Sequence, residues 1–150
     1  IRDVHVQALA LADRGRVYRL IEVCAFEYGV PLSEGFVEGF AHCMDGERDP
    51  RNLRLCFKIV PKIAERGLIT TEALAGSLFS VCSCYFPITF NPPPGDTVGI
   101  TNEILKNDLL ECMLGSHRFA QAATDLALGK LAASDSLEAK LDALDLISSQ

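Results

Sequence analysis

Apolar residues recur every three or four positions along most of this chain, the spacing that places them on one face of an α-helix. Counted with their capping residues, the seven predicted helices span residues 13–26, 33–44, 49–66, 72–84, 101–114, 117–132 and 136–147. Residues 85–90 would also suit a short extended segment, but no second run of comparable β-propensity is present to pair with it. The sequence therefore predicts an all-α fold of about seven helices.

Capping residues and glycines mark the helix boundaries. The residues expected to start helices by accepting hydrogen bonds from free backbone N–H groups are Asp13, Ser33, Asp49, Thr101 and Ser136. Pro50 then occupies the first position of the third helix, and Gly67 is placed to end it. The stripes expected to face the core include Val17, Leu20, Ile21 and Cys24 in the first helix, Phe36, Val37, Phe40, Cys43 and Met44 in the second, and Leu137, Leu141, Leu144 and Ile147 in the last.

A long insertion near residues 85–100 separates the fourth and fifth helices. Residues 84–96 of this segment hold three aromatic residues and four prolines, whereas links between bundled helices usually have about 2–8 residues. We expect Tyr85, Phe86, Ile88 and Phe90 to fasten an ordered insertion onto neighbouring helices. The alternative is an exposed aromatic and proline tip that binds a partner through Tyr85, Phe86 and the stiff run Pro92, Pro93 and Pro94.

The helix and link lengths favour a repeat architecture. They place one helical hairpin at intervals of about 35–45 residues, as in HEAT and armadillo solenoids. Residues 49–57 also resemble residues 135–143 in having a cap followed by a basic residue with apolar neighbours. We therefore expect an α-solenoid of stacked antiparallel helix pairs, with a plain helical bundle as the alternative. Because residue 1 is not Met and a helical pattern runs to the last residue, we expect 1–150 to be one domain cut from a longer array.

Composition and charge narrow the function. Of the 150 residues, 49% are hydrophobic and 23% are charged, and the formal net charge is −6. An acidic chain is a poor general binder of nucleic acid, because binding to phosphates needs a positive field. No run of about 18 apolar residues predicts a membrane span, and no secretory signal pattern is present. We expect an intracellular protein whose partners are proteins, with direct nucleic-acid binding unlikely.

Four cations follow the third helix at intervals of three, four and four residues: Arg51, Arg54, Lys58 and Lys62. A helix has about 3.6 residues per turn, so these cations fall in one narrow arc. The opposite side of the helix carries the apolar residues Leu53, Cys56, Phe57, Val60 and Ile63. We interpret the basic stripe as a candidate docking site for an acidic protein surface; the alternative is an ordinary solvated helix face.

A structural turn is predicted just before this helix, formed by Asp45, Arg48, Asp49, Pro50 and Asn52. The cap at Asp49 is worth about 0.5–2 kcal/mol. An arginine of the segment, Arg48 or Arg51, is expected to pair with one of its aspartates and so to lock adjacent helices. The Asn52 side chain is expected to satisfy backbone groups in the first turn.

No motif in the chain indicates a metal, a cofactor or catalysis. The six cysteines are Cys24, Cys43, Cys56, Cys82, Cys84 and Cys112, and they lack the spacing of zinc sites. The one close pair, Cys82 and Cys84, should point to different sides of a helix end. Acids such as Glu47, Asp49, Asp142 and Asp145 are numerous, and acids on helix faces are interpreted as solvating. Glycine-rich phosphate loops and nucleophile elbows are absent, so we predict that the chain is not an enzyme.

Three ordered blocks of the sequence resemble the MMS-nineteen family (methyl-methanesulfonate-sensitivity nineteen): residues 44–53, residues 84–100 and residues 136–146. The resemblance implies a HEAT-repeat α-solenoid from the amino-terminal half of that family. It also implies a non-catalytic scaffold in cytosolic iron–sulfur protein assembly, which helps to deliver clusters to apo-proteins, among them DNA-repair and replication enzymes. The implied partners are assembly-complex subunits and iron–sulfur client proteins, in the cytoplasm and nucleus. The rival hypothesis is a regulator of nucleotide excision repair or transcription, acting through a transcription–repair factor or nucleic acid.

Overall fold

The computed structural model describes residues 5–29, 31–32, 34–95 and 97–149. Across these residues the chain forms seven α-helices and no strand: α1 (Leu11–Glu22), α2 (Glu34–Met44), α3 (Pro50–Glu65), α4 (Glu72–Ser83), α5 (Asn102–Leu114), α6 (Ala120–Ala133) and α7 (Leu137–Ser148). A π-helical turn (Val23–Glu27) prolongs α1, and 3-10 turns lie at Val6–Ala8 and His117–Phe119. The all-α prediction is confirmed.

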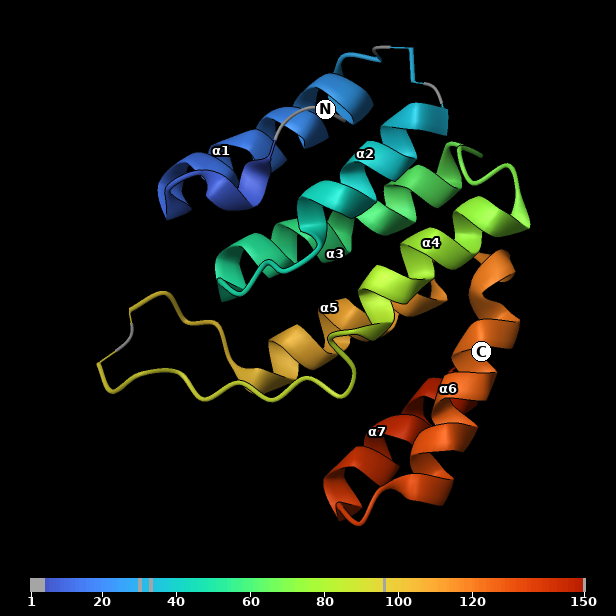
Figure 1. Cartoon of the computed structure of the whole chain (residues 1–150). Helices are drawn as coiled ribbons and strands as arrows, with labels where there is room; N and C mark the ends of the chain where they lie inside the picture. The colour runs from blue at the N-terminus through green and yellow to red at the C-terminus, as the bar shows by residue number, and fades with distance from the viewer. Residues whose placement is uncertain (1–4, 30, 33, 96, 150) are drawn as a thin grey trace.

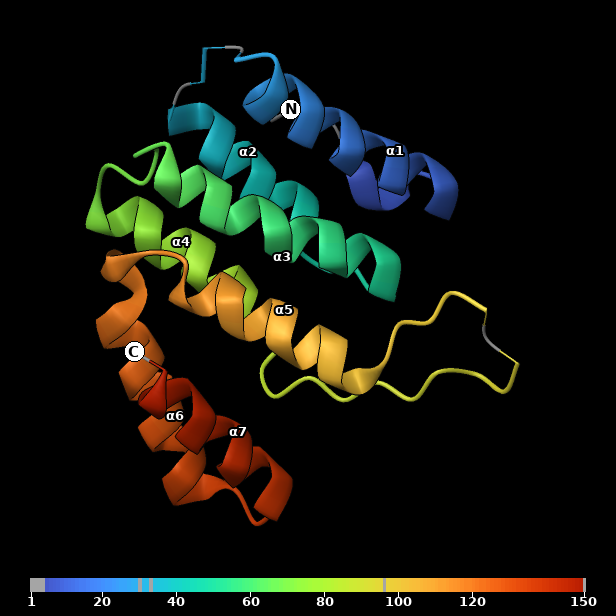
Figure 2. The same cartoon turned by 180° about the vertical axis from the view of Figure 1, so that it is seen from behind.

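The helices stack in two layers. Helices α1, α3 and α5 lie side by side in one layer, which faces the viewer in Figure 2. Helices α2 and α4 form the second layer, in front in Figure 1, and α6 and α7 pack closely against each other at the carboxy-terminal end. Because each helix pair covers the apolar face of the pair before it, the architecture is the predicted α-solenoid.

Most helix boundaries follow the capping chemistry of the sequence. The side chains of Asp49, Thr101 and Ser136 accept hydrogen bonds from backbone N–H groups in the first turns of α3, α5 and α7. Helix α3 ends at a left-handed Gly67 (φ 67°), where the amides of residues 67 and 68 return to the carbonyls of Ala64 and Ile63. The predicted cap Ser33 lies outside the described residues.

Two boundary predictions are wrong. Asp13 does not cap α1, because the helix begins two residues earlier at Leu11 with Ala10 at the cap position. Asp13 instead lies in the first turn and pairs with Arg16 at 2.7 Å. The sixth helix does not begin as an α-helix at His117, since residues 117–119 form a 3-10 turn before α6.

The core lies between the two layers. Its largest side chains with almost no exposure include Tyr18, Phe40, Phe57, Ile63, Leu78, Leu109 and Phe119. The predicted inward faces of α2 and α3 are confirmed, because all ten of their named side chains are buried. The prediction that Leu20 faces the core is wrong, since 62% of its surface is exposed while Tyr18, two residues earlier, is fully buried. In α7 the predicted face is wrong for its three leucines: Leu137, Leu141 and Leu144 are exposed, and Ala139, Ala143 and Leu146 are buried. The fourth predicted residue, Ile147, is partly buried against the core.

The insertion between α4 and α5 leaves the helical body as a long loop, at the left in Figure 1. Its first residues remain against the core, and its tip extends away from the helices in both views. It contains no strand among its described residues, so the segment 85–90 has no sheet partner.

Candidate partner-binding surfaces

The turn before α3 is organised by a buried carboxylate. Glu47 is 1% exposed, and its two oxygens accept five hydrogen bonds. The donors are Arg14 Nε and Nη2 at 2.9 and 3.0 Å, the backbone amides of Arg48 and Asp49 at 2.9 and 3.0 Å, and Asn52 Nδ2 at 3.3 Å. Glu47 thus joins α1 to the start of α3. Its interpretation as a solvating acid is wrong, because its cation comes from a helix 33 residues away.

The electrostatics of this site favour the ionised carboxylate. Burial acts to raise the pKa of Glu47, but the hydrogen bonds from Arg14 and from the two backbone amides outweigh it and lower the pKa below 4.5. Helix α1 also approaches α3 closely here, since a Cβ at Gly15 would lie 2.8 Å from Asn52 Oδ1. The sequence signal for this contact is a small residue in α1 one position after Arg14.

The remaining turn residues hold α3 in place. Asp49 accepts hydrogen bonds from the amides of Arg51 and Asn52, and Arg51 donates to both of its oxygens at 3.0 and 2.8 Å. Hydrogen bonds from Arg51, opposed by burial, lower the pKa of Asp49. The predicted arginine–aspartate pair is therefore present, but it joins residues two apart and does not lock adjacent helices. The Asn52 side chain donates to Glu47, and among the described residues it makes no hydrogen bond with a backbone group, contrary to expectation.

The four cations of α3 have different surroundings. Arg54 Nε donates to Asp108 of α5 at 2.5 Å, and Lys62 Nζ donates to Glu22 of α1 at 2.6 Å. These two half-buried cations tie α3 to its neighbours on either side. Lys58 is exposed and has no ion pair with any residue that the structure describes. Three of the four cations of the stripe are therefore paired with carboxylates of this chain, since Arg51 pairs with Asp49, and Lys58 is the one that has no ion pair among the described residues.

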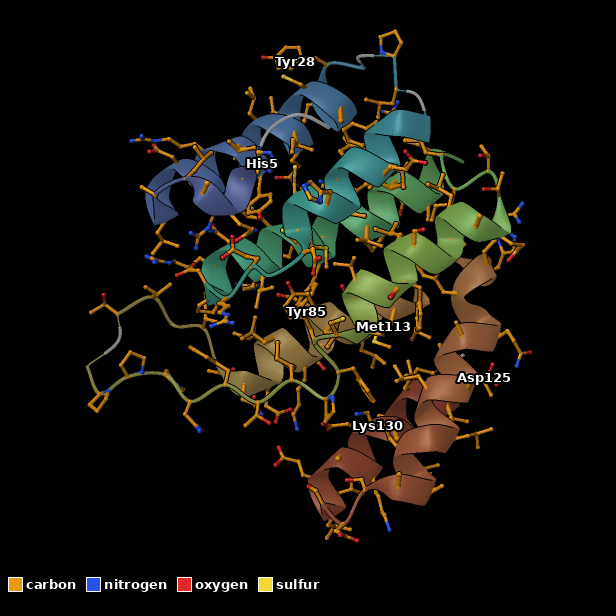
Figure 3. All side chains as sticks on the ribbon, in the orientation of Figure 1. His5, Tyr28, Tyr85, Met113, Asp125 and Lys130 are labelled. Atoms are coloured by element: carbon orange, nitrogen blue, oxygen red, sulfur yellow. The ribbon has the colours of Figure 1, made fainter. Side chains whose placement is uncertain are left out.

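Tyr85 and Phe86, the first residues of the insertion, pack against the core of the fold. The Tyr85 hydroxyl donates to the Met44 carbonyl at 2.9 Å, and its ring meets Phe57 edge-on at a centroid distance of 5.6 Å. Figure 3 places Tyr85 in the middle of the molecule. Burial raises the pKa of the Tyr85 hydroxyl. Phe86, Ile88 and Phe90 are half-buried against the core.

The far part of the insertion is open to solvent. Pro92, Pro93 and Pro94 are exposed. Behind them, the amide of Phe90 donates to Asn102 Oδ1 at 2.7 Å, which ties the insertion to the start of α5. A hollow of about 320 Å³ lies between the insertion and the start of α3, and its lining includes Phe90 and Pro93. The insertion therefore has a fastened base and a solvent-facing tip.

A second groove, of about 360 Å³, lies between α5 and α7 at the base of the insertion. Lys106 of α5 crosses it and donates to Glu138 at 2.7 Å and to Asp142 at 3.0 Å. Partial burial acts to lower the pKa of Lys106, but these two carboxylates raise it above its usual value. Sequence reasoning missed this groove, because it is lined by residues from three separate segments.

The cysteines are free thiols. Cys82 is buried and Cys84 is exposed, so the prediction that they point to different sides is confirmed. The Cys82 and Cys112 sulfurs lie 3.4 Å apart in the core. Over the described ranges, no three His, Cys, Asp or Glu side chains come together in a way that would hold a metal ion. Nor does any described helix have the length and apolar character to span a membrane.

Comparison with known proteins gives a match over the whole chain. Residues 1–150 match the family MMS19_N, described as "Dos2-interacting transcription regulator of RNA-Pol-II". Proteins named "MMS19 nucleotide excision repair protein homolog" from Xenopus tropicalis and Homo sapiens are each 40% identical over 149 residues, covering 97% of this chain. The "MMS19 nucleotide excision repair protein" of Drosophila melanogaster is 33% identical over 144 residues, or 94% of the chain.

These relatives are much longer, and the chain spans 14% of the first two and 15% of the third. The resemblance that the sequence blocks indicated is thereby confirmed. Because the family match extends from residue 1 to residue 150, this chain belongs to the MMS19 family and corresponds to its amino-terminal region.

Proposed function

We propose that this chain is part of a non-catalytic scaffold that helps to deliver iron–sulfur clusters to apo-proteins, including DNA-repair and replication enzymes. The observation that carries the proposal is the family match over all 150 residues, with relatives named as nucleotide excision repair proteins. A solenoid suits such a role, because stacked repeats offer an extended surface to several partners at once. The chain would then be one domain of a longer HEAT-repeat array that works in the cytoplasm and nucleus.

The partners of this region would be client proteins and assembly-complex subunits. Their candidate contacts are the basic stripe on α3 (Arg51, Arg54, Lys58 and Lys62) and the insertion (Tyr85, Phe86, Pro92, Pro93 and Pro94). Arg51, Lys58 and the three prolines are exposed. Arg54 and Lys62 are already ion-paired within the fold. A client would therefore contact these two cations together with their carboxylate partners.

The proposal is tested by the iron content of a client. Cells that lack the endogenous family member are supplied with radioactive iron, and an iron–sulfur helicase is immunoprecipitated with and without the full-length protein restored. We expect client iron to fall in its absence and to return with the wild-type protein. Normal client iron in the deficient cells would refute the proposal.

A second candidate function is regulation of transcription or excision repair without cluster delivery. The family description, which names a transcription regulator of RNA polymerase II, favours it. In that case repair or transcription would fail while client iron stayed normal. Direct action on nucleic acid would appear as a steep salt dependence in a DNA titration, because phosphate contacts release counterions. The net charge of −6 disfavours that form of the hypothesis.

A further inference from the structure

The groove between α5 and α7 combines an apolar floor with acidic walls. Phe86 and Ile88 from the insertion, Leu110 from α5 and Leu141 from α7 supply the floor of this space of about 360 Å³. Its size is at the lower end of the range of ligand pockets in proteins, about 300–1,000 Å³. The floor continues outward as an exposed stripe of Leu137, Leu141 and Leu144 on α7, which are 72%, 52% and 50% exposed. Contiguous apolar surface of this kind marks interaction sites.

The charges around the groove are unbalanced. Four carboxylates line it, from Glu103, Glu138, Asp142 and Asp145, against the single ammonium of Lys106, which leaves a net charge of −3. Lys106 is held by Glu138 and Asp142. Glu103 and Asp145 have no cation among the residues that the structure describes, and they lie on the two helices that flank the groove. A ligand that brings positive charge to these two walls would therefore meet carboxylates that are not yet paired.

We propose that this groove binds a basic amphipathic helix of a partner protein, an inference that rests on the scaffold function proposed above. The apolar side chains of the helix would lie on the floor and along the α7 leucines, as in other complexes where an amphipathic helix occupies a groove. Its lysines or arginines would pair with Glu103 and Asp145. An acidic helix or a nucleic acid would be repelled by the same carboxylates, so the charge of the groove selects the sign of its partner.

The site also separates two kinds of partner within one chain. On α3, the ammonium of Lys58 would attract an acidic group, since the other three cations of the stripe are paired within the fold, while the groove between α5 and α7 is negative and would attract basic groups. Arg54 of the stripe is neutralised by Asp108 of α5, the helix that lies between α3 and the groove. A partner with one acidic and one basic segment would therefore favour one orientation across α3, α5 and α7.

The test uses the 150-residue chain and a fluorescein-labelled peptide of about 14 residues, made of lysine and leucine with helical spacing. A peptide with glutamate in place of lysine is the reference ligand. Binding is followed by fluorescence anisotropy at low and high salt, and amide NMR spectra locate the contact. The variant E103K/D145K reverses the charge of two acids that line the groove, and Leu141→Ser removes part of its apolar surface. The matched control, E111K/D125K, makes the same charge change at exposed acids that do not line the groove, and Figure 3 shows Asp125 on the outer side of α6.

We expect the lysine peptide to bind with a salt-dependent affinity and to shift the amides that line the groove. E103K/D145K should weaken binding at least about tenfold, which corresponds to about 1.4 kcal/mol, and the control should bind clearly better than the reversed variant. The inference is overturned if the peptide does not bind, if the glutamate peptide binds equally well, or if both double variants lose equal affinity. These results would leave the scaffold function intact, because client iron content tests it separately.

Discussion

Replacing Glu47 by glutamine tests whether a buried ion pair holds α1 against α3. The change keeps the shape of the side chain but removes its charge and turns one acceptor oxygen into an NH₂ group. In the better of its two orientations the amide nitrogen takes the place of Oε2, where it faces two donors, Arg14 Nε and Asn52 Nδ2. The other oxygen still accepts from Arg14 Nη2 and the amides of Arg48 and Asp49, but without a negative charge.

The magnitude follows from the groups left without a partner. A buried donor without an acceptor costs about 1–3 kcal/mol, and more when it is charged. Removing one member of a buried ion pair costs about 3–5 kcal/mol. The Arg14 side chain is 18% exposed, so water relieves part of its loss. We therefore expect E47Q to lower the free energy of unfolding by about 3 kcal/mol, and Tm by about 6–12 °C for a chain of this size.

Urea unfolding followed by circular dichroism measures this difference. The matched control is Glu111→Gln, the same chemical change at an exposed acid of α5, which should change stability by less than about 0.5 kcal/mol. The reasoning is refuted if E47Q unfolds within about 0.5 kcal/mol of the wild type.

The pH dependence of the free energy of unfolding, measured for the wild type and for E47Q, gives an independent check. Because folding lowers the pKa of Glu47, its contribution to stability is full above the ordinary value of 4.5 and is lost as pH falls through the lower folded pKa. Wild-type stability should therefore decline as the pH falls below 4.5. The decline should be shallower in E47Q, which lacks this carboxylate.

Three further predictions concern packing and recognition. Tyr85→Phe should cost about 0.5–1.5 kcal/mol in urea unfolding, because it removes the hydroxyl that donates to a carbonyl at the end of α2; an unchanged midpoint would contradict that bond. Gly115→Ala should lower the free energy of unfolding, since the added Cβ would lie 3.1 Å from Pro61. Gly129→Ala in α6, where nothing lies within 4 Å of the added Cβ, should raise it by about 0.5–1 kcal/mol in the same urea titration. Lys58→Glu in the full-length protein should leave helicity unchanged but reduce co-precipitation of iron–sulfur clients at low salt, and undiminished capture would count against the basic stripe.

The helices of this fold were predictable because their signals are local. The caps Asp49, Thr101 and Ser136 act on amides two or three residues away, and Gly67 ends α3 through its own backbone angle. Such interactions are readable in a short window of sequence. Family resemblance then supplied the order in which the helices stack, which periodicity alone left open between a solenoid and a bundle.

The interactions that hold the layers together were not predictable in the same way. Glu47 looked like one acid among many, because its partner Arg14 lies on another helix. The same holds for Arg54 with Asp108 and for the Lys106 pairs. A helical pattern shows which side chains share a face, but the partner across an interface depends on how far each helix is shifted along its neighbour. Only coordinates fix that shift.

Helix α7 shows why hydrophobic periodicity also has a physical limit. It carries two stripes with the same spacing, Leu137–Leu141–Leu144 and Ala139–Ala143–Leu146, and they lie about 200° apart on a helix of 3.6 residues per turn. Burial of larger side chains favours the first stripe, but α6 presents its own alanines, Ala123 and Ala127, and these are fully buried. Small residues on both helices let their backbones approach closely, so the second stripe faces inward. The leucines are left at the surface beside the acidic groove, where a partner's apolar side chains would gain the burial that α6 does not provide.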